Sequence, residues 1–231
     1  MKKPITSLVV MTMLALFMSC IPPALADSIA TIDLTSPNAA LSGYTGPFAT
    51  LTIDLTSSTT ATITFTSDVH SGYIYLMGGT NAVDLNVNAT SFAVSTISGT
   101  NFMSGFQTPS LSNGGSGNVD GFGTLNLNIN AFDGFTHSAT SISFTLTNTS
   151  GTWGTANDVL IANSNGALAA IHGFACLDSP NVCTSSTGAS ATGFVANGGG
   201  VSVPETGQFT ALLAGIVCFG GILISGRRRK S

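Results

Sequence analysis

The sequence contains no lysine and no arginine between residues 4 and 226. All six basic residues lie near the two ends, at Lys2, Lys3, Arg227, Arg228, Arg229 and Lys230. Proteins that bind nucleic acid neutralise its phosphates with lysine and arginine side chains. The central region lacks these groups, so the sequence excludes nucleic acid as a partner.

Glutamate is almost absent too, because Glu205 is the only one in the chain. The other acidic residues are aspartates: Asp27, Asp33, Asp54, Asp68, Asp84, Asp120, Asp133, Asp158 and Asp178. No lysine or arginine of the central region can pair with them. We therefore expect stability to come from apolar burial and hydrogen bonds. A length of 231 residues allows one β-rich domain plus targeting segments.

The N-terminal segment, residues 1–26, has the pattern of a signal peptide. Lys2 and Lys3 precede an apolar stretch over residues 8–18, and Ala24 and Ala26 form an A-x-A cleavage site. The apolar stretch is short for a membrane span. We expect a signal peptidase to cut after Ala26. Lipid modification at Cys20 is the alternative, although Phe17 stands where such sites usually have leucine.

The C-terminal segment predicts one transmembrane helix over about residues 208–226. Residues 209–225 (FTALLAGIVCFGGILIS) carry no charge, and a basic stop follows at Arg227, Arg228, Arg229 and Lys230. By the positive-inside rule, this stop stays in the cytoplasm and the central region lies outside. The sequence therefore predicts a precursor anchored in the inner membrane with its body exported, and later released to the cell surface or the exterior.

Directly before this span stand Val203, Pro204, Glu205, Thr206 and Gly207. A Pro-Glu motif, a span rich in leucine and glycine and a final arginine cluster resemble the PEP-CTERM sorting tail that exosortases recognise. Thr206 departs from that pattern, since a second proline is usual there. The motif is also similar to the LPxTG signal of Gram-positive sortases, with valine in place of leucine.

The lysine-free body favours one of these two resemblances. Gram-positive wall proteins usually contain many lysines, so we favour an exosortase-type membrane protease as partner and keep a sortase as the alternative. Either resemblance implies cleavage within the tail, residues 201–231, near Pro204 to Gly207.

The body, residues 27–200, alternates apolar and small polar residues with a period of two. The alternation is clearest in five segments, 50–55, 60–65, 83–87, 125–130 and 142–146. It predicts strands with one buried face and one wet face. About ten such strands predict an all-β fold, an antiparallel β-sandwich or jelly roll.

Two features of the body leave alternatives open. The hexapeptide TIDLTS occurs at residues 31–36 and 52–57, which would suit a β-solenoid, but it is not sustained and we interpret it as two similar strands. The segment 166–174 (GALAAIHGF) could be a short helix or a buried strand. Most of the body also resembles an uncharacterised secreted type that occurs ahead of PEP-CTERM tails, in segments 117–123, 132–137 and 147–153. That resemblance implies no known activity.

Only two cysteines belong to the predicted body, Cys176 and Cys183. In an oxidising compartment we expect them to form a disulfide that closes a short loop. A metal pair is the alternative, but no nearby histidine completes such a site.

Catalytic residue types occur without a recognisable motif. Asp68, His70 and Ser71, or Asp133, His137 and Ser138, have the composition of a hydrolytic triad, yet the chain has no G-x-S-x-G elbow. Coincidence explains these groupings better. The third histidine, His172, allows a three-histidine metal site only if the fold brings all three together.

Two ligand classes remain as hypotheses. Calcium is one, because residues 114–120 (GGSGNVD) approach a calcium-binding β-roll repeat, although solvated turn aspartates are the simpler interpretation. Carbohydrate is the other, because Tyr73, Tyr75 and Trp153 could stack on sugar rings. Threonine ladders such as Thr60, Thr62, Thr64 and Thr66 could face a polymer.

These observations predict an exported protein of the cell envelope or extracellular matrix. We expect a structural or adhesive role without catalysis, no required cofactor, and exopolysaccharide as a candidate partner. The alternative is a secreted carbohydrate-active or metal-dependent enzyme, which a cleft joining His70, His137 and His172 would favour.

Overall fold

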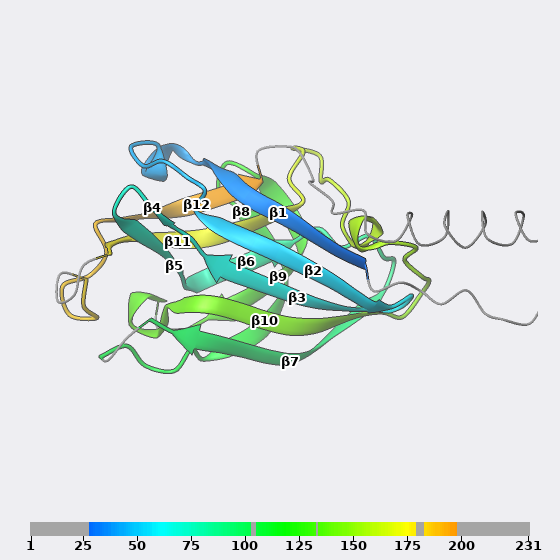
Figure 1. Ribbon diagram of the computed structural model, residues 1–231. Helices are drawn as coiled ribbons and strands as arrows, with labels where there is room; N and C mark the ends of the chain where they lie inside the picture. Colours follow the sequence, from blue (N-terminus) through cyan, green and yellow to red (C-terminus); the bar gives the residue numbers. More distant parts are fainter. Residues whose placement is uncertain (1–27, 103–104, 133, 179–182, 198–231) are drawn as a thin grey trace, which may run out of the picture.

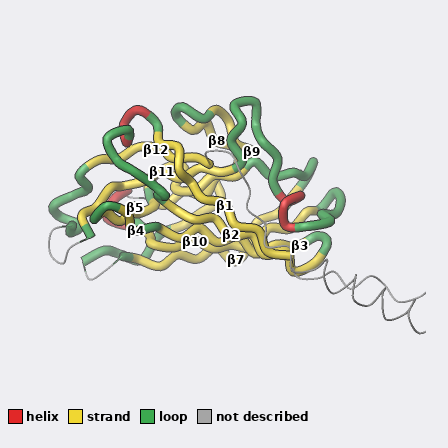
Figure 2. Tube along the Cα trace, turned by 45° about the horizontal axis from the view of Figure 1, so that its top comes forward, coloured by secondary structure: helices red, strands yellow, loops and turns green. Residues whose placement is uncertain are grey.

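A computed structural model describes residues 28–102, 105–132, 134–178 and 183–197. These ranges form β1 (Ser28–Pro37), β2 (Ala49–Ser57), β3 (Thr60–Ser67), β4 (Val69–His70), β5 (Tyr73–Met77), β6 (Gly79–Leu85), β7 (Phe92–Asn101), β8 (Leu111–Val119), β9 (Gly123–Ala131), β10 (Ala139–Asn148), β11 (Ala169–Leu177) and β12 (Ala191–Asn197). Three short 3₁₀ helices lie in loops at strand ends, η1 (Ala39–Leu41), η2 (Gly134–His137) and η3 (Ala156–Val159) (Figure 2). No α-helix occurs in the described ranges. The all-β prediction is confirmed.

All strand pairs are antiparallel, and the pairing order is β4-β5-β10-β3-β2-β1-β12-β11-β6-β9-β8, with β7 paired to β10. β5 also pairs with β11, so the order β5-β10-β3-β2-β1-β12-β11 closes on itself. Figure 1 shows β1, β2, β3, β10 and β7 side by side, which we name the front layer. We name β12, β11, β5, β6, β9 and β8 the back layer.

The main core lies between the two layers. Alternate residues of β2, β3 and β10, such as Ile53, Ile63 and Phe144, are buried in one cluster with Val83 and Ile129 of the back layer. The period of two in the sequence therefore marks the inner face of each strand. Smaller clusters lie elsewhere, including one around the buried cysteines.

The two TIDLTS segments form two strands that pair with each other. They lie in β1 and β2, where Thr31 is opposite Thr52. The ambiguous segment 166–174 contributes to β11, a strand that is buried along most of its length. Its continuous apolar run reflects this burial, since a strand covered on both faces shows no alternation.

A large irregularity separates β5 from β6, although both pair with β11. Met77 pairs with Gly173 and Val83 pairs with Ile171, so residues 78–82 all lie opposite His172 alone. Gly79 and Asn81 have positive φ, at 74° and 56°, which lets the chain bulge outward at this point.

One prediction about this layer is wrong. The alternation predicts a wet face for Asp84 and for the asparagines of β9, but Asp84 is 0% exposed and Asn128 is 4% exposed. Asn128 lies against β8, where a Cβ at Gly114 or Gly117 would meet its side chain. Asp84 lies between Ala170 of β11 and Asn128 of β9.

Candidate functional site

The outer face of the front layer carries an ordered array of hydroxyl side chains. Strand pairing aligns three rows across the five strands: Asp33, Thr50, Thr66, Ser141, Thr100; Thr31, Thr52, Thr64, Ser143, Ser98; and Ile29, Asp54, Thr62, Thr145, Ser95. We name these rows the hydroxyl array. Every position is serine or threonine except Asp33, Asp54 and Ile29, so the array confirms the threonine ladder of β3 and extends it over four more strands.

The array arises from pairing in register. The opposite faces of the same strands are buried, which fixes which side chains point outward, because a slip by one residue would expose the core residues. Neighbouring strands lie about 4.8 Å apart, and successive positions on one face of a strand about 6.8 Å apart. The hydroxyl groups of β1, β2, β3 and β10 therefore repeat at regular intervals in two directions, and a bulge between Ser95 and Ser98 interrupts the repeat in β7.

Some side chains of the array form hydrogen bonds with each other or with the backbone of the same sheet. Thr64 Oγ1 and Ser143 Oγ lie 3.0 Å apart in the middle row, and Ser143 Oγ donates to the carbonyl of Ile63 at 3.0 Å. Hydroxyl groups both donate and accept, so the array offers both functions to a ligand. The only ionisable residues in its rows are Asp33 and Asp54, and the described residues contain no lysine or arginine.

A hollow of about 370 Å³ lies between the η1–β2 loop and the β4–β5 hairpin, lined by Gly43, Tyr44, Thr45, Ser71, Tyr73 and Tyr75. We name it the tyrosine hollow. The hairpin turns at Ser71 and Gly72, both with positive φ (52° and 79°). Two such residues form the tight turn that suits a β-hairpin. The turn places Ser71 at the tip and Tyr73 directly after it.

Aromatic contacts hold the hollow in shape. The Tyr44 ring meets the Tyr73 ring edge to face, with centroids 5.0 Å apart, and Tyr75 packs on Phe48 at 4.6 Å. The Tyr75 hydroxyl donates to the carbonyl of Thr45 at 3.0 Å. Tyr44 and Tyr73 are half-buried while Tyr75 is buried, so the first two present ring surface to a ligand.

A carboxylate connects the hollow's hairpin to the hydroxyl array. Thr50 of the first row donates to Asp68 Oδ2 at 2.9 Å, and the backbone N–H of Tyr75 donates to the carbonyl of Asp68 at 3.4 Å. Burial raises the pKa of Asp68, and the bond from Thr50 partly opposes this shift. Burial also raises the pKa of the Tyr75 hydroxyl, with smaller contributions from Tyr44 and Tyr73.

The sugar-stacking hypothesis therefore stays a prediction for Tyr73 and is wrong for Tyr75 and Trp153. Tyr73 lines the hollow, but Tyr75 is 0% exposed and Trp153 is 2% exposed. Trp153 is a core residue whose indole N–H donates to the carbonyl of Asn88 at 2.8 Å. Tyr44 was not predicted from the sequence, where its signal is its position between Gly43 and Gly46 in a turn-rich segment.

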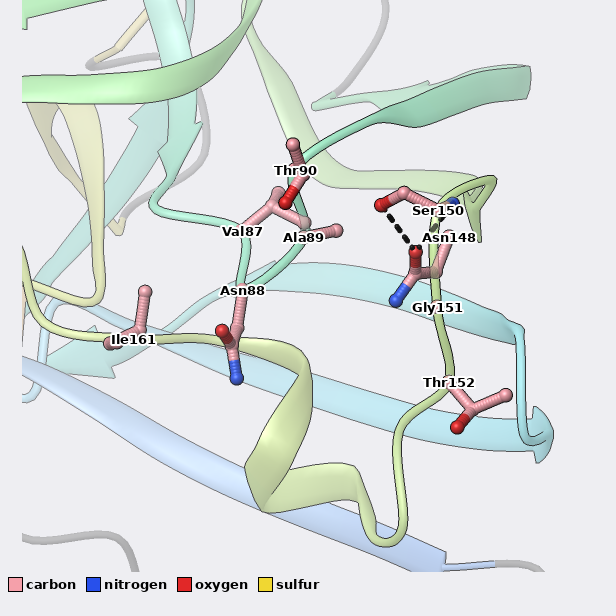
Figure 3. A pocket seen from close by; sticks show the side chains of 9 residues that line it. All are labelled: Val87, Asn88, Ala89, Thr90, Asn148, Ser150, Gly151, Thr152 and Ile161. Atoms are coloured by element: carbon pink, nitrogen blue, oxygen red, sulfur yellow. Dashed lines mark hydrogen bonds between the residues drawn. The ribbon is translucent and has the colours of Figure 1, made fainter.

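A second hollow, of about 440 Å³, lies beside the β6–β7 connection and is lined by Val87, Asn88, Ala89, Thr90, Asn148, Ser150, Gly151, Thr152 and Ile161 (Figure 3). Its amides already serve the fold. Asn88 donates to the carbonyl of Asp158 at 2.9 Å, and Asn148 Oδ1 accepts from Ser150 at 3.2 Å. It has no aromatic ring to stack on a sugar.

The serines of the two triad groupings are not placed for catalysis. Ser71 Oγ meets Thr45 Oγ1 at 3.0 Å rather than a histidine. Ser138 is 0% exposed, which closes its hydroxyl to a substrate, and Asp133 lies outside the described residues. Within the described ranges, no group of three or more His, Cys, Asp or Glu residues could hold a metal ion.

The third histidine has a structural environment. His172 stacks on Phe194 with centroids 4.5 Å apart, and its Nδ1 donates to the carbonyl of Thr80 at 3.2 Å. That bond leaves Nε2 to accept from Thr192 at 2.9 Å. Burial lowers the pKa of His172, and the backbone bonds oppose the shift.

The segment considered for calcium is a strand followed by a turn. Residues 114–119 belong to β8, and Phe122 N–H bonds to the carbonyl of Val119. Asp120 Oδ2 accepts from Asn38 Nδ2 at 3.0 Å. Asp120 therefore ties two loops together, as a turn aspartate does, and the β-roll interpretation is wrong.

Cys176 and Cys183 form a disulfide, with Cα atoms 5.5 Å apart. Both residues are buried, in a cluster with Ile74, Leu76 and Phe174. The disulfide prediction is confirmed, and the bond suits an oxidising compartment.

The targeting predictions fall outside the described residues. These are the cleavage site at Ala24 and Ala26, the motif Val203 to Gly207, the span 208–226 and the basic stop Arg227 to Lys230. In the ranges that the structure describes, no helix has the length and hydropathy required to cross a membrane.

No protein family model matches this chain, and no curated protein and no solved structure matches it either.

Proposed function

We propose that this chain is an exported protein of the cell envelope or extracellular matrix, whose body is a β-sandwich that binds polysaccharide without catalysis. The observation that carries this proposal is the hydroxyl array together with the tyrosine hollow. Asp68 connects the two, because it accepts a hydrogen bond from Thr50 of the first row and from the backbone of Tyr75. Two layers around one core support the β-sandwich. The confirmed disulfide supports an oxidising location.

The chemistry of the two surfaces suits a sugar polymer. Tyr44 and Tyr73 present ring faces to the apolar faces of a sugar, and exposed hydroxyls at Thr45 and Ser71 stand beside them. The array then offers hydroxyl groups at regular intervals to a chain with repeating hydroxyls. Each contact is weak, so affinity would depend on many simultaneous contacts along the polymer. The lack of lysine and arginine on these surfaces favours a neutral polymer over a strongly anionic one.

Binding can be tested by co-sedimentation of the full chain with purified exopolysaccharides of graded charge. We expect Tyr44→Ala and Tyr73→Ala each to weaken binding about two- to tenfold, because each removes a stacking ring. Phe132→Ala is the matched control, since Phe132 is 56% exposed and lies outside the site. Equal binding by the double tyrosine variant and the unaltered chain would refute the proposal.

The C-terminal motif supports the second part of the proposal, that an exosortase-type protease processes a PEP-CTERM-like tail. Mass spectrometry of protein released from cells should find a C-terminus between Val203 and Gly207. Deleting the exosortase gene should keep the protein in the membrane fraction. A released form that retains Arg227 would show that no sorting enzyme cuts the tail.

A further inference from the structure

The second hollow, beside the β6–β7 connection, is lined by two asparagine amides whose orientations the fold fixes. Asn148 Oδ1 accepts from the backbone N–H of Ser150 at 3.0 Å and from Ser150 Oγ at 3.2 Å. Turning this amide would set its nitrogen against the backbone N–H, so the oxygen must face Ser150. Asn148 Nδ2 therefore points away from Ser150 and into the hollow (Figure 3).

Asn148 Nδ2 is a donor group that needs an acceptor. Asn148 is 6% exposed, and no residue that the structure describes accepts a hydrogen bond from its Nδ2. A polar group buried without a partner is unfavourable, and most such groups in folded proteins are paired with protein or with another molecule. A ligand in the hollow can supply the missing acceptor.

Asn88 offers the opposite function from the other wall of the hollow. Its Nδ2 donates to the carbonyl of Asp158 at 2.9 Å, which leaves Oδ1 as an acceptor. The backbone N–H of Asn88 donates to the carbonyl of Val159 at 2.9 Å, and the carbonyl of Asn88 accepts from Trp153 at 2.8 Å. These three bonds hold Asn88 in place before any ligand arrives, which lowers the entropic cost of binding.

The rest of the lining is uncharged and partly apolar. Val87, Ala89 and Ile161 belong to it, and Ile161 is 51% exposed although it is a large apolar residue. Thr90 and Thr152 add exposed hydroxyl groups. None of the nine lining residues is ionisable, so the hollow suits a neutral ligand that has both polar groups and a small apolar group.

A secondary amide that carries a methyl group matches this lining. Its carbonyl would accept from Asn148 Nδ2, and its N–H would donate to Asn88 Oδ1. The C=O and N–H of a trans amide point in opposite directions, and Figure 3 shows Asn88 and Asn148 on opposite sides of the hollow. The methyl group would pack on Ile161. A hollow of about 440 Å³ is in the size range of ligand sites and has room for a sugar ring beside the amide.

We propose that the second hollow binds an N-acetylated amino sugar through its acetamido group. A sugar fits better than a peptide, the other common source of secondary amides, because its ring brings hydroxyl partners for Thr90 and Thr152. With contacts to a single sugar residue, we expect a Kd on the order of 1 mM. This inference goes beyond the proposed function, since no residue of the second hollow belongs to the hydroxyl array or the tyrosine hollow.

The test titrates the full chain with N-acetylglucosamine, followed by the fluorescence of Trp153, the single tryptophan. Trp153 donates to the carbonyl of Asn88, so a ligand beside Asn88 should change its emission. Saturation-transfer NMR at the acetyl methyl group provides a second measurement. Glucose, which lacks the acetamido group, should bind at least about tenfold more weakly. Equal binding of the two sugars, or no binding of N-acetylglucosamine by either measurement, overturns the proposal.

Two variants of the lining test the two amides separately. Asn148→Asp keeps the acceptor for the Ser150 N–H and replaces the unpartnered donor by an oxygen, so it should weaken N-acetylglucosamine binding about ten- to hundredfold. Asn88→Ala removes the acceptor at an exposed position and should weaken binding about two- to tenfold, a result that does not depend on whether Asn148→Asp folds. Asn157→Ala is the matched control, because Asn157 is exposed in η3 and does not line the hollow. Unchanged binding in either lining variant, or an equal loss in the control, overturns the proposal.

Two further comparisons locate the site and its ligand class. The double variant Tyr44→Ala, Tyr73→Ala should bind N-acetylglucosamine as the unaltered chain does. Loss of binding in that variant would place the sugar in the tyrosine hollow, which overturns this inference and leaves the polysaccharide proposal standing. N-acetylglycine methylamide carries the same amide on a peptide. If it binds more tightly than N-acetylglucosamine, the hollow is a peptide site and the proposal is overturned.

Discussion

The front and back layers of the body carry their polar residues in opposite ways. In the front layer, the hydroxyl array lies on the outer face, and the alternation of β2, β3 and β10 runs without a break over most of each strand. In the back layer, Asp84 and Asn128 are buried, and bulges interrupt β6 and β8. The same residue spacing therefore produces an open polar face in one layer and a closed polar group in the other.

The difference comes from what lies above each face. The side chains of the hydroxyl array are half-buried or exposed. In the back layer, Gly114 and Gly117 lack the Cβ atoms that would collide with Asn128, so β8 can lie close against that side chain. Local composition of one strand thus decides the environment of residues on another.

The largest effect on the free energy of unfolding should come from a substitution on the inner face of the front layer. Ile63→Ala removes a side chain that is 0% exposed, and we expect a loss of about 2–5 kcal/mol in the free energy of unfolding. Thr62→Ala, one residue away on the outer face, should change it by less than about 1 kcal/mol. Urea unfolding followed by Trp153 fluorescence measures both. Equal losses would mean that the two faces of β3 are not distinct.

The second-largest effect on stability tests how closely β8 lies against the asparagines of β9. Gly114→Ala places a Cβ against the amides of Asn128 and Asn130, and we expect a loss of about 1–3 kcal/mol. Gly151→Ala is the control, because its Cβ would have ordinary contacts with Asn148 at 3.7 Å. If both variants unfold at the same urea concentration, β8 does not lie closely over the asparagines.

A smaller effect depends on pH and on His172 of the back layer. Because burial lowers its folded pKa below the ordinary value of 6.5, the unfolded chain takes up a proton first as pH falls. Stability should therefore be full above pH 6.5 and decrease as pH falls toward the folded pKa, by at most about 1.4 kcal/mol per pH unit. Urea unfolding at a series of pH values gives this slope. His172→Asn should flatten it, and a slope unchanged by the substitution would assign the effect to other groups.

The smallest effect on stability should come from the hydroxyl array. Thr52→Val keeps the shape and β propensity of the side chain, so we expect a change within about 0.5 kcal/mol. Binding to polysaccharide should nevertheless weaken when Thr52, Thr64 and Thr31 are all replaced by valine. A triple variant that binds as the unaltered chain does would limit the binding site to the tyrosine hollow.

The front layer could be predicted from the sequence because its strands have one buried and one open face. The strands around residues 50–55, 60–65 and 142–146 follow the period of two, and the structure confirms them. The register that lines up Thr31, Thr52 and Thr64 could not be predicted, since it depends on pairing between segments far apart in the chain.

The back layer could be predicted only in part. Segment 166–174 has no alternation because β11 is covered on both faces, so helix and strand could not be separated. The glycine run of β8 was considered only as a possible calcium-binding repeat, and its close approach to Asn81, Asn128 and Asn130 depends on pairing between distant segments. Tyr75 and Trp153 look like binding residues by type alone, and only packing distinguishes them from Tyr73.

The pairing of β1 with β12 has a consequence for the order in which the chain folds. The first described strand hydrogen-bonds with the last, and Pro37 lies opposite Val195. About 150 residues must therefore be synthesised after β1 before its partner β12 exists. The β1–β2–β3 hairpins can assemble early, but one edge of β1 stays open until β12 emerges. Folding of this chain therefore finishes only when synthesis of the body is complete, and until then that edge is the part most in need of protection from wrong pairing.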